Sequence, residues 1–505
     1  MTESPTAKDT SSLSVDQVLR MAIDSQKTWD ERDAIAPVRD MIARHPDEPR
    51  LHQMLGVLYR ALDENAQALH HFDKAARLAP DNPRIAYAAA QVRLDAGLPA
   101  AERFERALAL APQDKQALLG YVAALLEAGE AQQADRLLED ALVVDPGWAD
   151  GHAALVRLRW QGGQGDASWR SVRAAAESRG DDVPLWRELI LGLMHAKKFE
   201  VALAEIAKAR RLAGADIFFD SSEAGCLDEL GRFAEAERIF LGMGRVAHAG
   251  IALRFTRHLL KAGRPQDAAA VALVWTAEDG AQHFWPYIAT AWRMTDDPRW
   301  QWLEGDPRLT GVYDITADIG SLDELAAFLR RLHQTTHQPL EQSLRGGTQT
   351  NGRLFARIEP EVQRLRQAIV KAVERHAAQL PPMGAKHPTL GVKPKEIRFA
   401  GSWSVRLTGE GHHAVHMHPE GWFSSAFYVA LPENMDAEKP EAGWLTMGDQ
   451  PEFPGCPPAF RAVRPEVGRL ALFPSTMWHG TKPITGGERM TVAFDIARGP
   501  GFAQR

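Results

Sequence analysis

The stretch HHAVHMHPEGWFSSAFYVALP, residues 412–432, decides how the C-terminal half of the chain is organised. Four of its histidines fall within seven residues, and a half-apolar run follows from Phe423 to Leu431. On a β-strand, side chains i and i+2 point to the same face. The histidine-rich part is therefore predicted to place His416 and His418 side by side, where two imidazoles can bind one metal ion.

A third histidine and an arginine follow this pair at a distance. His479 comes 61 residues after His418, just beyond the predicted strand LALFPS, and Arg489 lies ten residues further on. Three protein ligands on one face of a metal, with its other positions open, are typical of non-haem iron sites. Arg489 begins the predicted strand RMTVAFDI, in which Thr491 shares its face. A guanidinium and a hydroxyl on one face can hold a carboxylate, so the pattern predicts iron with a dicarboxylate cosubstrate.

Short apolar runs bounded by Gly, Pro and Asp surround these residues from Lys395 onward. Their alternation and their β-branched and aromatic content predict strands. The predicted strands are IRFAGSWSVRL, HAVHMH, FSSAFYVAL, GWLTM, GRLALFP and MTVAFDIA. Several short strands separated by turns predict a jelly roll or a related β-barrel, whose open end can hold a metal.

Two helices and a loop are predicted before the strands. The segment SLDELAAFLRR, residues 321–331, has Ser321 in the position of a helix cap. A second amphipathic helix is predicted from about Glu359 to Leu380. Between them, RGGTQTNG at residues 345–352 is predicted to be a flexible loop, suited to a lid over a buried site.

The first half of the chain repeats. Pro46, Pro80, Pro112 and Pro146 lie 34, 32 and 34 residues apart, and a period of 34 is typical of tetratricopeptide repeats. We expect about seven helix pairs. The array is either a spacer or a concave surface that binds a peptide or protein, and its length favours binding.

One repeat can be followed position by position. In the unit that ends at Pro80, Gly56 and Ala68 are small where two helices approach each other. Tyr59 and Phe72 are predicted to fill the space between the helices, and Pro80 to stop the second helix.

These patterns divide the chain into four predicted segments. They are a polar, disordered tail at residues 1–14, helical repeats at 15–280, a tryptophan-rich interdomain seam at 281–315, and a β-rich domain at 316–505. The fold class is α + β with several domains, an N-terminal α-solenoid being followed by a jelly roll with flanking helices.

Composition narrows the setting of the protein. The formal net charge of -7 argues against nucleic acid as the main partner. No run of 18 apolar residues is present, so no membrane span is expected. The only cysteines, Cys226 and Cys456, exclude a disulfide framework and favour a reducing cytoplasm.

Residues 346–499 resemble the 2-oxoglutarate- and Fe(II)-dependent dioxygenases, and most of all those fused to tetratricopeptide repeats. The resemblance rests on GSWSVRL, HMHPEGWFSSAFYVALP, GRLALFPSTMWHGT and ERMTVAFD. It implies a double-stranded β-helix, an iron ligand at His479 and a 2-oxoglutarate anchor at Arg489. It also implies that Tyr428 touches the cosubstrate. Arg406, on the predicted strand SWSVRL, is the next candidate for the anchor.

The chain departs from this family in one motif. The usual motif is His-x-Asp, whereas here His416-x-His418 overlaps His418-x-Glu420. The first reading gives three histidine ligands, and the geometry of a strand favours it. The second gives two histidines and a carboxylate, which balances the ferrous charge better. Both readings stay open on the sequence.

Three functions follow as hypotheses. The first is a hydroxylase that uses Fe(II), 2-oxoglutarate and molecular oxygen, with the repeats recruiting a protein or peptide substrate. The second is a non-catalytic repeat scaffold that carries an inactive or sensing metal-binding barrel. The third is a cupin-like metalloenzyme without 2-oxoglutarate, against which Arg489 argues.

Overall fold

The computed structural model describes residues 13–244, 248–278, 280–382, 384, 386–391, 393–433, 435 and 439–499. Most of the predicted tail, residues 1–12, lies outside these ranges, and Ser14 caps the first helix. Two compact units emerge. The first holds the chain up to Glu130 together with Gly352–Gln363, and the second holds Ala131–Asn351 with Arg364–Arg498.

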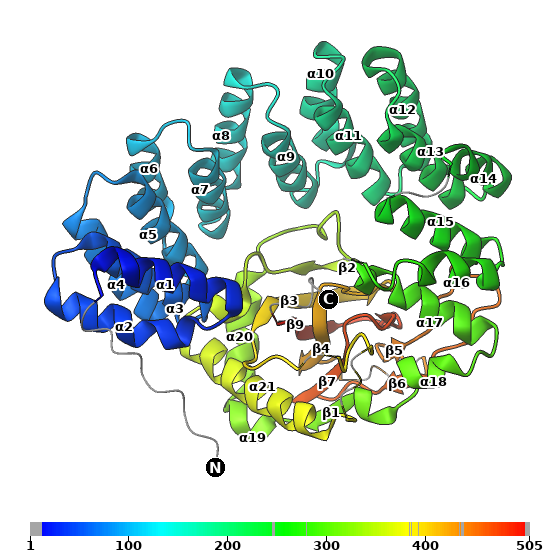
Figure 1. Cartoon of the computed structure of the whole chain (residues 1–505). Helices are drawn as coiled ribbons and strands as arrows, with labels where there is room; N and C mark the ends of the chain where they lie inside the picture. Colours follow the sequence, from blue (N-terminus) through cyan, green and yellow to red (C-terminus); the bar gives the residue numbers. More distant parts are fainter. Residues whose placement is uncertain are drawn as a thin grey trace. The chain divides into compact units, whose positions relative to one another are not determined.

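Eight consecutive helix pairs account for the region predicted to be repeats, one pair more than the seven expected (Figure 1). No strand occurs between residues 13 and 278 in the parts that are described, which confirms the helical array. The pairs are α1 Val15–Thr28 and α2 Glu31–Arg44, α3 Pro49–Ala61 and α4 Asn65–Leu78, α5 Pro83–Asp95 and α6 Ala101–Leu110, α7 Lys115–Glu127 and α8 Ala131–Val144, α9 Ala149–Gln161 and α10 Arg170–Ser178, α11 Val183–His195 and α12 Phe199–Ala213, α13 Ile217–Glu229 and α14 Phe233–Gly242, and α15 Ala249–Lys261 and α16 Pro265–Leu273.

The repeat examined position by position packs as its sequence predicts. Tyr59, Ala68 and Phe72 are buried between α3 and α4. Gly56 lies against the Phe72 ring so closely that an added Cβ would meet ring carbons at 2.8 Å. Helix α4 ends at Leu78, two residues before Pro80. Alternating small and large residues therefore set how closely these helices approach.

A later segment of the chain belongs to the first unit. Asn65 Nδ2 donates to the Ala356 carbonyl at 2.7 Å, and Arg353 pairs with Asp63 at 2.6 Å. Arg357 pairs with Glu127 at 3.3 Å. These contacts explain why residues 352–363 group with the first repeats although they follow them by more than two hundred residues.

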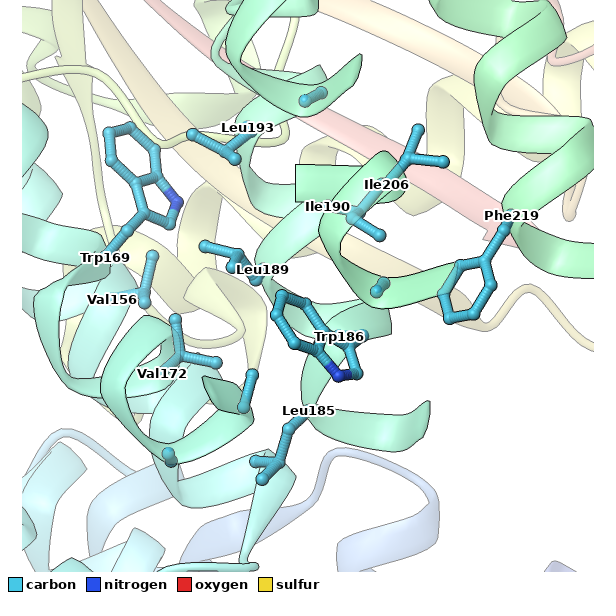
Figure 2. Packing of buried hydrophobic residues seen from close by; sticks show 14 of the residues in the cluster. Val156, Trp169, Val172, Leu185, Trp186, Leu189, Ile190, Leu193, Ile206 and Phe219 are labelled. Atoms are coloured by element: carbon cyan, nitrogen blue, oxygen red, sulfur yellow. The ribbon is translucent and has the colours of Figure 1, made fainter. Parts of the chain in front are cut away.

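In the second unit, the middle repeats share one large apolar cluster (Figure 2). Trp169 and Trp186 are its largest fully buried members. Leu340 joins this cluster from the segment that precedes the β-rich domain. The Trp160 indole also donates to the Gln338 carbonyl at 3.1 Å, so the repeats fix the position of that segment.

The predicted seam is made of short helices whose tryptophans pack against neighbouring residues, although Trp302 stays 46% exposed. Trp292 is buried among residues of α15–α17. The Trp300 ring contacts Phe460, and the Trp302 ring contacts His387. These elements are η2 Ala281–His283, α17 Trp285–Met294, α18 Arg299–Leu303 and η3 Pro307–Leu309. Packing, rather than a ligand cage, therefore accounts for the tryptophans. None of the described helices is both long enough and apolar enough to cross a membrane.

The β-rich domain consists of two antiparallel sheets, as predicted for a jelly roll. The larger sheet has the order β1-β7-β4-β9-β3-β2, and the smaller has β6-β5-β8. Leu445 and Val463 of the smaller sheet pack on Ala471 and Phe473 of the larger. The strands are β1 Gly311–Asp314, β2 Leu344–Gln349, β3 Phe399–His413, β4 Gly421–Ala430, β5 Leu445–Met447, β6 Arg461–Val463, β7 Arg469–Pro474, β8 His479–Thr481 and β9 Glu488–Ala497.

The flanking helices match their prediction. Helix α20, Leu322–Leu332, begins after Ser321, whose side chain accepts from the Glu324 amide at 3.2 Å. Helix α21 runs from Pro360 to Gln379. The remaining short helices are η1 Gly165–Trp169, α19 Thr316–Ile319 and η4 Leu354–Ala356.

Two local predictions were wrong. Residues 345–352 do not form a lid, because most of them belong to β2 at the edge of the larger sheet. Gly346, with φ +68°, lies at a bulge between β2 and β3, so its glycine marks an irregular strand and not a loop. The segment HAVHMH is not a continuous strand either. Beyond the end of β3 only His416 makes a bridge, and its partner is His479.

The tight contact at Gly56 gives a prediction for the first unit. Gly56→Val places two methyl groups where the Phe72 ring already lies, so we expect it to lower the free energy of unfolding by about 2 kcal/mol. Urea unfolding followed by circular dichroism measures this change. Gly250→Val is the matched control, because no atom lies within 4 Å of a Cβ built there. An unchanged unfolding midpoint for Gly56→Val would contradict this packing.

Candidate metal centre

Three histidines from two separate segments converge beside the larger sheet. His416 and His479 exchange both backbone hydrogen bonds, each of 2.9 Å, so their side chains emerge together. The His418 amide donates to the Ser475 carbonyl at 2.8 Å, which ties the same two segments together two residues later. One ring nitrogen from each of the three histidines lies within 4.8 Å of the others.

The other ring nitrogen of each histidine already has a partner in the protein. Nδ1 of His416 lies 2.8 Å from the Ala414 carbonyl, and Nδ1 of His479 lies 3.0 Å from the Met477 carbonyl. Nδ1 of His418 lies 3.0 Å from Oδ2 of Asp495. Each acceptor requires a proton on Nδ1, which leaves Nε2 of each ring with a free lone pair. The three rings are thus set in the tautomer that a metal needs.

Electrostatics keeps His416 and His479 neutral. Burial, together with the neighbouring imidazoles, holds the pKa of His416 and that of His479 well below the ordinary value. Burial and the charge of Arg489 lower the pKa of His413, which lines the same cavity, to about 3. Neutral imidazoles at neutral pH do not have to lose a proton before they bind a cation.

Asp495 supplies a negative charge behind His418. Its side chain is 13% exposed, and its second oxygen lies 2.5 Å from the Ser424 hydroxyl. The sequence analysis did not select Asp495. It lies six residues after Arg489 on β9, and alternation along that strand puts the two on one face. That alternation was the only clue to Asp495 that the sequence held.

A buried cation occupies the same cavity. Arg489 is 1% exposed, and its Nε and Nη1 have no hydrogen-bond partner. Its guanidinium carbon lies 5.1 Å from the centre of the Tyr428 ring, whose hydroxyl is also buried without a partner. Burial lowers the pKa of Arg489 and raises that of Tyr428. A buried guanidinium without an anion is costly, so this arrangement suits an anionic ligand.

The histidines and the cation share one cavity of about 50 Å³. Its wall includes Thr491 beside Arg489, as the strand alternation predicted. Trp403 lines it as well, and its ring stacks on His418. Ser343 reaches in from the segment before β2, and its hydroxyl lies 3.2 Å from Nε2 of His416 and 3.0 Å from Nδ1 of His413.

Two predicted residues lie elsewhere. Glu420 has a side chain that is 74% exposed, and it pairs with His283 at 3.1 Å instead of joining the histidines. Arg406 pairs with Glu488 at 2.5 Å on the other face of β3 from the cavity. His413, which the sequence analysis did not select, lines the cavity instead.

Comparisons with known proteins agree with this architecture. Residues 401–495 match the family described as "Putative 2OG-Fe(II) oxygenase", and residues 100–158 match the tetratricopeptide repeat family. No match was found among the curated proteins with which the sequence was compared. The chain therefore combines a tetratricopeptide-repeat region with a C-terminal domain of the 2OG-Fe(II) oxygenase family.

Several solved structures that resemble part of the chain are repeat proteins. A tetratricopeptide repeat protein from Parabacteroides merdae ATCC 43184 is 18% identical, with a TM-score of 0.30, and the match covers 46% of this chain and 94% of that one. MamA from Desulfovibrio magneticus RS-1 is 16% identical, with a TM-score of 0.29, over 35% of this chain and 96% of that one. YrrB, described as "a TPR protein with an unusual peptide-binding site", is 16% identical, with a TM-score of 0.25, over 36% of this chain and 95% of that one.

The converging nitrogens give a prediction about metal binding. His416→Ala and His479→Ala are each expected to abolish stoichiometric Fe(II) binding, because either change leaves only two ligands. Glu420→Ala is expected to bind Fe(II) like the unaltered protein, since its carboxylate lies outside the cluster. Anaerobic titration with Fe(II) measures both. Retained stoichiometric iron in His416→Ala or in His479→Ala would rule out this ligand set.

Asp495 gives a second prediction. Asp495→Ala removes the acceptor that orients His418, and we expect Fe(II) affinity to fall by about 10- to 100-fold. Asp495→Asn can still accept the Nδ1 hydrogen but lacks the charge, so its affinity should lie between the two. The same titration provides the measurement. Equal affinities for all three proteins would mean that Asp495 does not act through His418.

Proposed function

We propose that this protein is a 2-oxoglutarate- and Fe(II)-dependent hydroxylase. The observation that carries the proposal is the shared cavity, lined by three clustered imidazoles and by one buried guanidinium whose Nε and Nη1 are unpartnered. A metal accounts for the imidazoles and an anion accounts for the guanidinium. A dicarboxylate that also binds the metal satisfies both groups at once.

Each residue has a defined role in this proposal. His416, His418 and His479 hold Fe(II) through their Nε2 atoms. Arg489 binds the far carboxylate of 2-oxoglutarate through two parallel N–H groups, and the Thr491 hydroxyl donates to the same carboxylate. Tyr428 lies against Arg489, and its buried hydroxyl is within reach of that end of the cosubstrate.

Three imidazole ligands bring no negative charge to balance that of the ferrous ion. Asp495 compensates for this without being a ligand. Its carboxylate accepts the hydrogen bond from Nδ1 of His418, which makes Nε2 of that ring more basic. The sequence left open whether the motif is His418-x-Glu420 or His416-x-His418. We propose the second, which gives three histidine ligands.

The iron and 2-oxoglutarate, when bound with molecular oxygen, supply oxidative decarboxylation to succinate coupled to hydroxylation of a C–H bond. The chain contributes position and dryness. Phe473 and Leu445 line the cavity together with Trp403, and these apolar walls exclude water from the reacting atoms. Ser343, on the segment that precedes β2, places its hydroxyl beside His416.

The tetratricopeptide repeats are of a kind that typically binds peptides or proteins, and we propose that they recruit a protein or peptide substrate. Cys226 and Cys456 are both free, which suits a reducing compartment, and we propose the cytoplasm as the place of action.

A non-catalytic scaffold is the second candidate, and the absence of a carboxylate from the His416, His418 and His479 cluster favours it. One assay separates the two. Purified protein with Fe(II), oxygen and 2-oxoglutarate either releases succinate or does not. Release that is lost in His479→Ala supports the hydroxylase, whereas no release above that of His479→Ala supports the scaffold.

Arg489 gives the sharpest prediction. Arg489→Ala is expected to weaken 2-oxoglutarate binding by roughly 10- to 100-fold and to leave Fe(II) affinity nearly unchanged, because a charge-assisted bidentate bond contributes about 1.5–3 kcal/mol. Arg489→Lys should lie between, since lysine keeps the charge but not the planar fork. Titration of the iron-loaded protein with 2-oxoglutarate measures this.

A stability measurement serves as the control for Arg489→Ala. Without cosubstrate, the unpartnered guanidinium is a burden on the fold, so the metal-free alanine variant should melt at the same temperature as the unaltered protein or higher. A variant that melts much lower has lost packing and not only an anchor. If the alanine variant is folded and binds 2-oxoglutarate normally, Arg489 is not the anchor.

A further inference from the structure

A second and larger cavity lies beside the metal centre, within the same compact unit. Its volume is about 380 Å³, which falls in the range of ligand-binding cavities. Three successive repeats form one wall, through α11, α13 and α15, and residues 340–345 form the other. We call it the repeat cavity. It shares Gln342 with the cavity of the three histidines, so the two spaces are neighbours.

The acidic groups in the wall of the repeat cavity all have basic partners. Asp228 lies 2.7 Å from Nδ1 of His258, and both are buried. Glu229 pairs with Arg257 and also with Lys261 at 2.9 Å. The other two wall carboxylates pair in the same way, Glu452 with Arg257 at 2.5 Å, and Glu341 with Arg157 at 3.8 Å. Each of these carboxylates therefore already has a nitrogen partner.

Two arginines of the wall lack such partners. Arg254 donates from Nη1 to the Ser221 carbonyl at 2.9 Å, and Arg345 donates from Nη1 to the carbonyls of Gln342 and Leu344. Among the described residues, no carboxylate lies within ion-pair distance of either guanidinium. Burial lowers the pKa of both. Carbonyls hold the two side chains in place, but no negative charge offsets theirs.

The remaining wall is apolar and comes from the repeats. Met194, Phe199 and Phe240 line it, and Leu340 faces them from the opposite segment. Leu340 is also a member of the core cluster of the middle repeats, so the wall is firmly held. A ligand for this space therefore needs an anionic group together with apolar surface.

The arrangement of the helices identifies the kind of ligand. Helices α11, α13 and α15 are the first helices of three consecutive pairs, so the wall extends along the array and not around one point. Successive repeats form extended binding surfaces that follow a chain rather than enclose a small molecule. Arg254, on α15, and Arg345, at the start of β2, line the cavity from its two walls.

We propose that the repeat cavity binds an acidic side chain of a substrate peptide, with Arg254 and Arg345 as its anchors. The peptide then continues past Gln342 toward the three histidines, so that a residue near the acidic one reaches the metal centre. This proposal rests on the proposed hydroxylase function, because it names the class of substrate for that site. It adds a specificity-determining site that lies outside the cavity with Arg489.

The test uses the full chain without iron and a synthetic library of ten-residue peptides. Half of the peptides carry Glu at the central position and half carry Gln, and no other acidic residue is present. The protein is immobilised, and the retained peptides are counted by mass spectrometry. We expect Glu peptides to be retained about tenfold more than Gln peptides, as expected for one charge-assisted pair.

Variants then locate the effect. Arg254→Gln and Arg345→Gln should each reduce the preference for Glu several-fold, while Arg308→Gln, whose partner Asp306 lies outside the cavity, should keep it. Two independent variants protect the test against misfolding of either one. No preference for Glu, or a preference that both cavity variants retain, overturns the proposal. Free glutarate that displaces the peptides at equal concentration also overturns it, since the site then belongs to a small dicarboxylate.

The outcome is separable from that of the proposed function. Retention of peptides requires neither Fe(II) nor 2-oxoglutarate, so it does not depend on turnover. Arg254→Gln should leave 2-oxoglutarate titration unchanged, unlike Arg489→Ala. A protein that prefers Glu peptides but never releases succinate would keep the repeat cavity as an acidic-peptide site and would remove only the hydroxylase.

Discussion

The hydrogen bonds to the three Nδ1 atoms are the constraint on which the metal centre depends. Two backbone carbonyls and the carboxylate of Asp495 fix the tautomers of His416, His479 and His418. Nε2 of each ring is then left to act as a ligand, and burial disfavours protonation of His416 and His479. Within the metal-free fold this cluster adds little stability, because its lone pairs have no partner as strong as a metal ion. The strand pairing and the apolar walls around it hold an arrangement that becomes favourable only when a cation binds.

Arg489 is also a group without its natural partner, but here the missing partner is an anion and not a cation. Its charge is buried, its Nε and Nη1 have no partner among the described residues, and no carboxylate of the cavity pairs with it; the ring of Tyr428 lies beside it. Groups left unsatisfied in this way lower stability, and proteins keep them where function needs them. The guanidinium of Arg489 and the imidazole lone pairs lie in one small cavity. Together they suit a ligand that has one anionic group for the guanidinium and another that binds the metal. The two unsatisfied halves are therefore more informative together than either is alone.

The sequence predicted the structural features that depend on local periodicity. The 34-residue period predicted the helix pairs, and alternation along β9 placed Thr491 beside Arg489, because both follow from backbone geometry. It failed where pairing between distant segments decides. The glycines of residues 345–352 indicated a loop, yet β3 captures that segment as a strand with a bulge. Asp495 was missed because only the register of β9 against β4, which sets Asp495 opposite Ser424, brings it to His418.

The segment between α20 and β2 connects the repeats with the chemistry. Gln338 and Leu340 are held by α9 and by the apolar cluster of the middle repeats, and Ser343, three residues further on, contacts His416. Three residues of extended chain span at most about 10 Å, so the position of Ser343 follows that of Leu340 closely. A ligand that orders the wall of the repeat cavity also orders the residue beside the metal ligand. If the repeats bind the substrate as proposed, this short, well-anchored piece of backbone would couple that binding to the geometry of the metal centre.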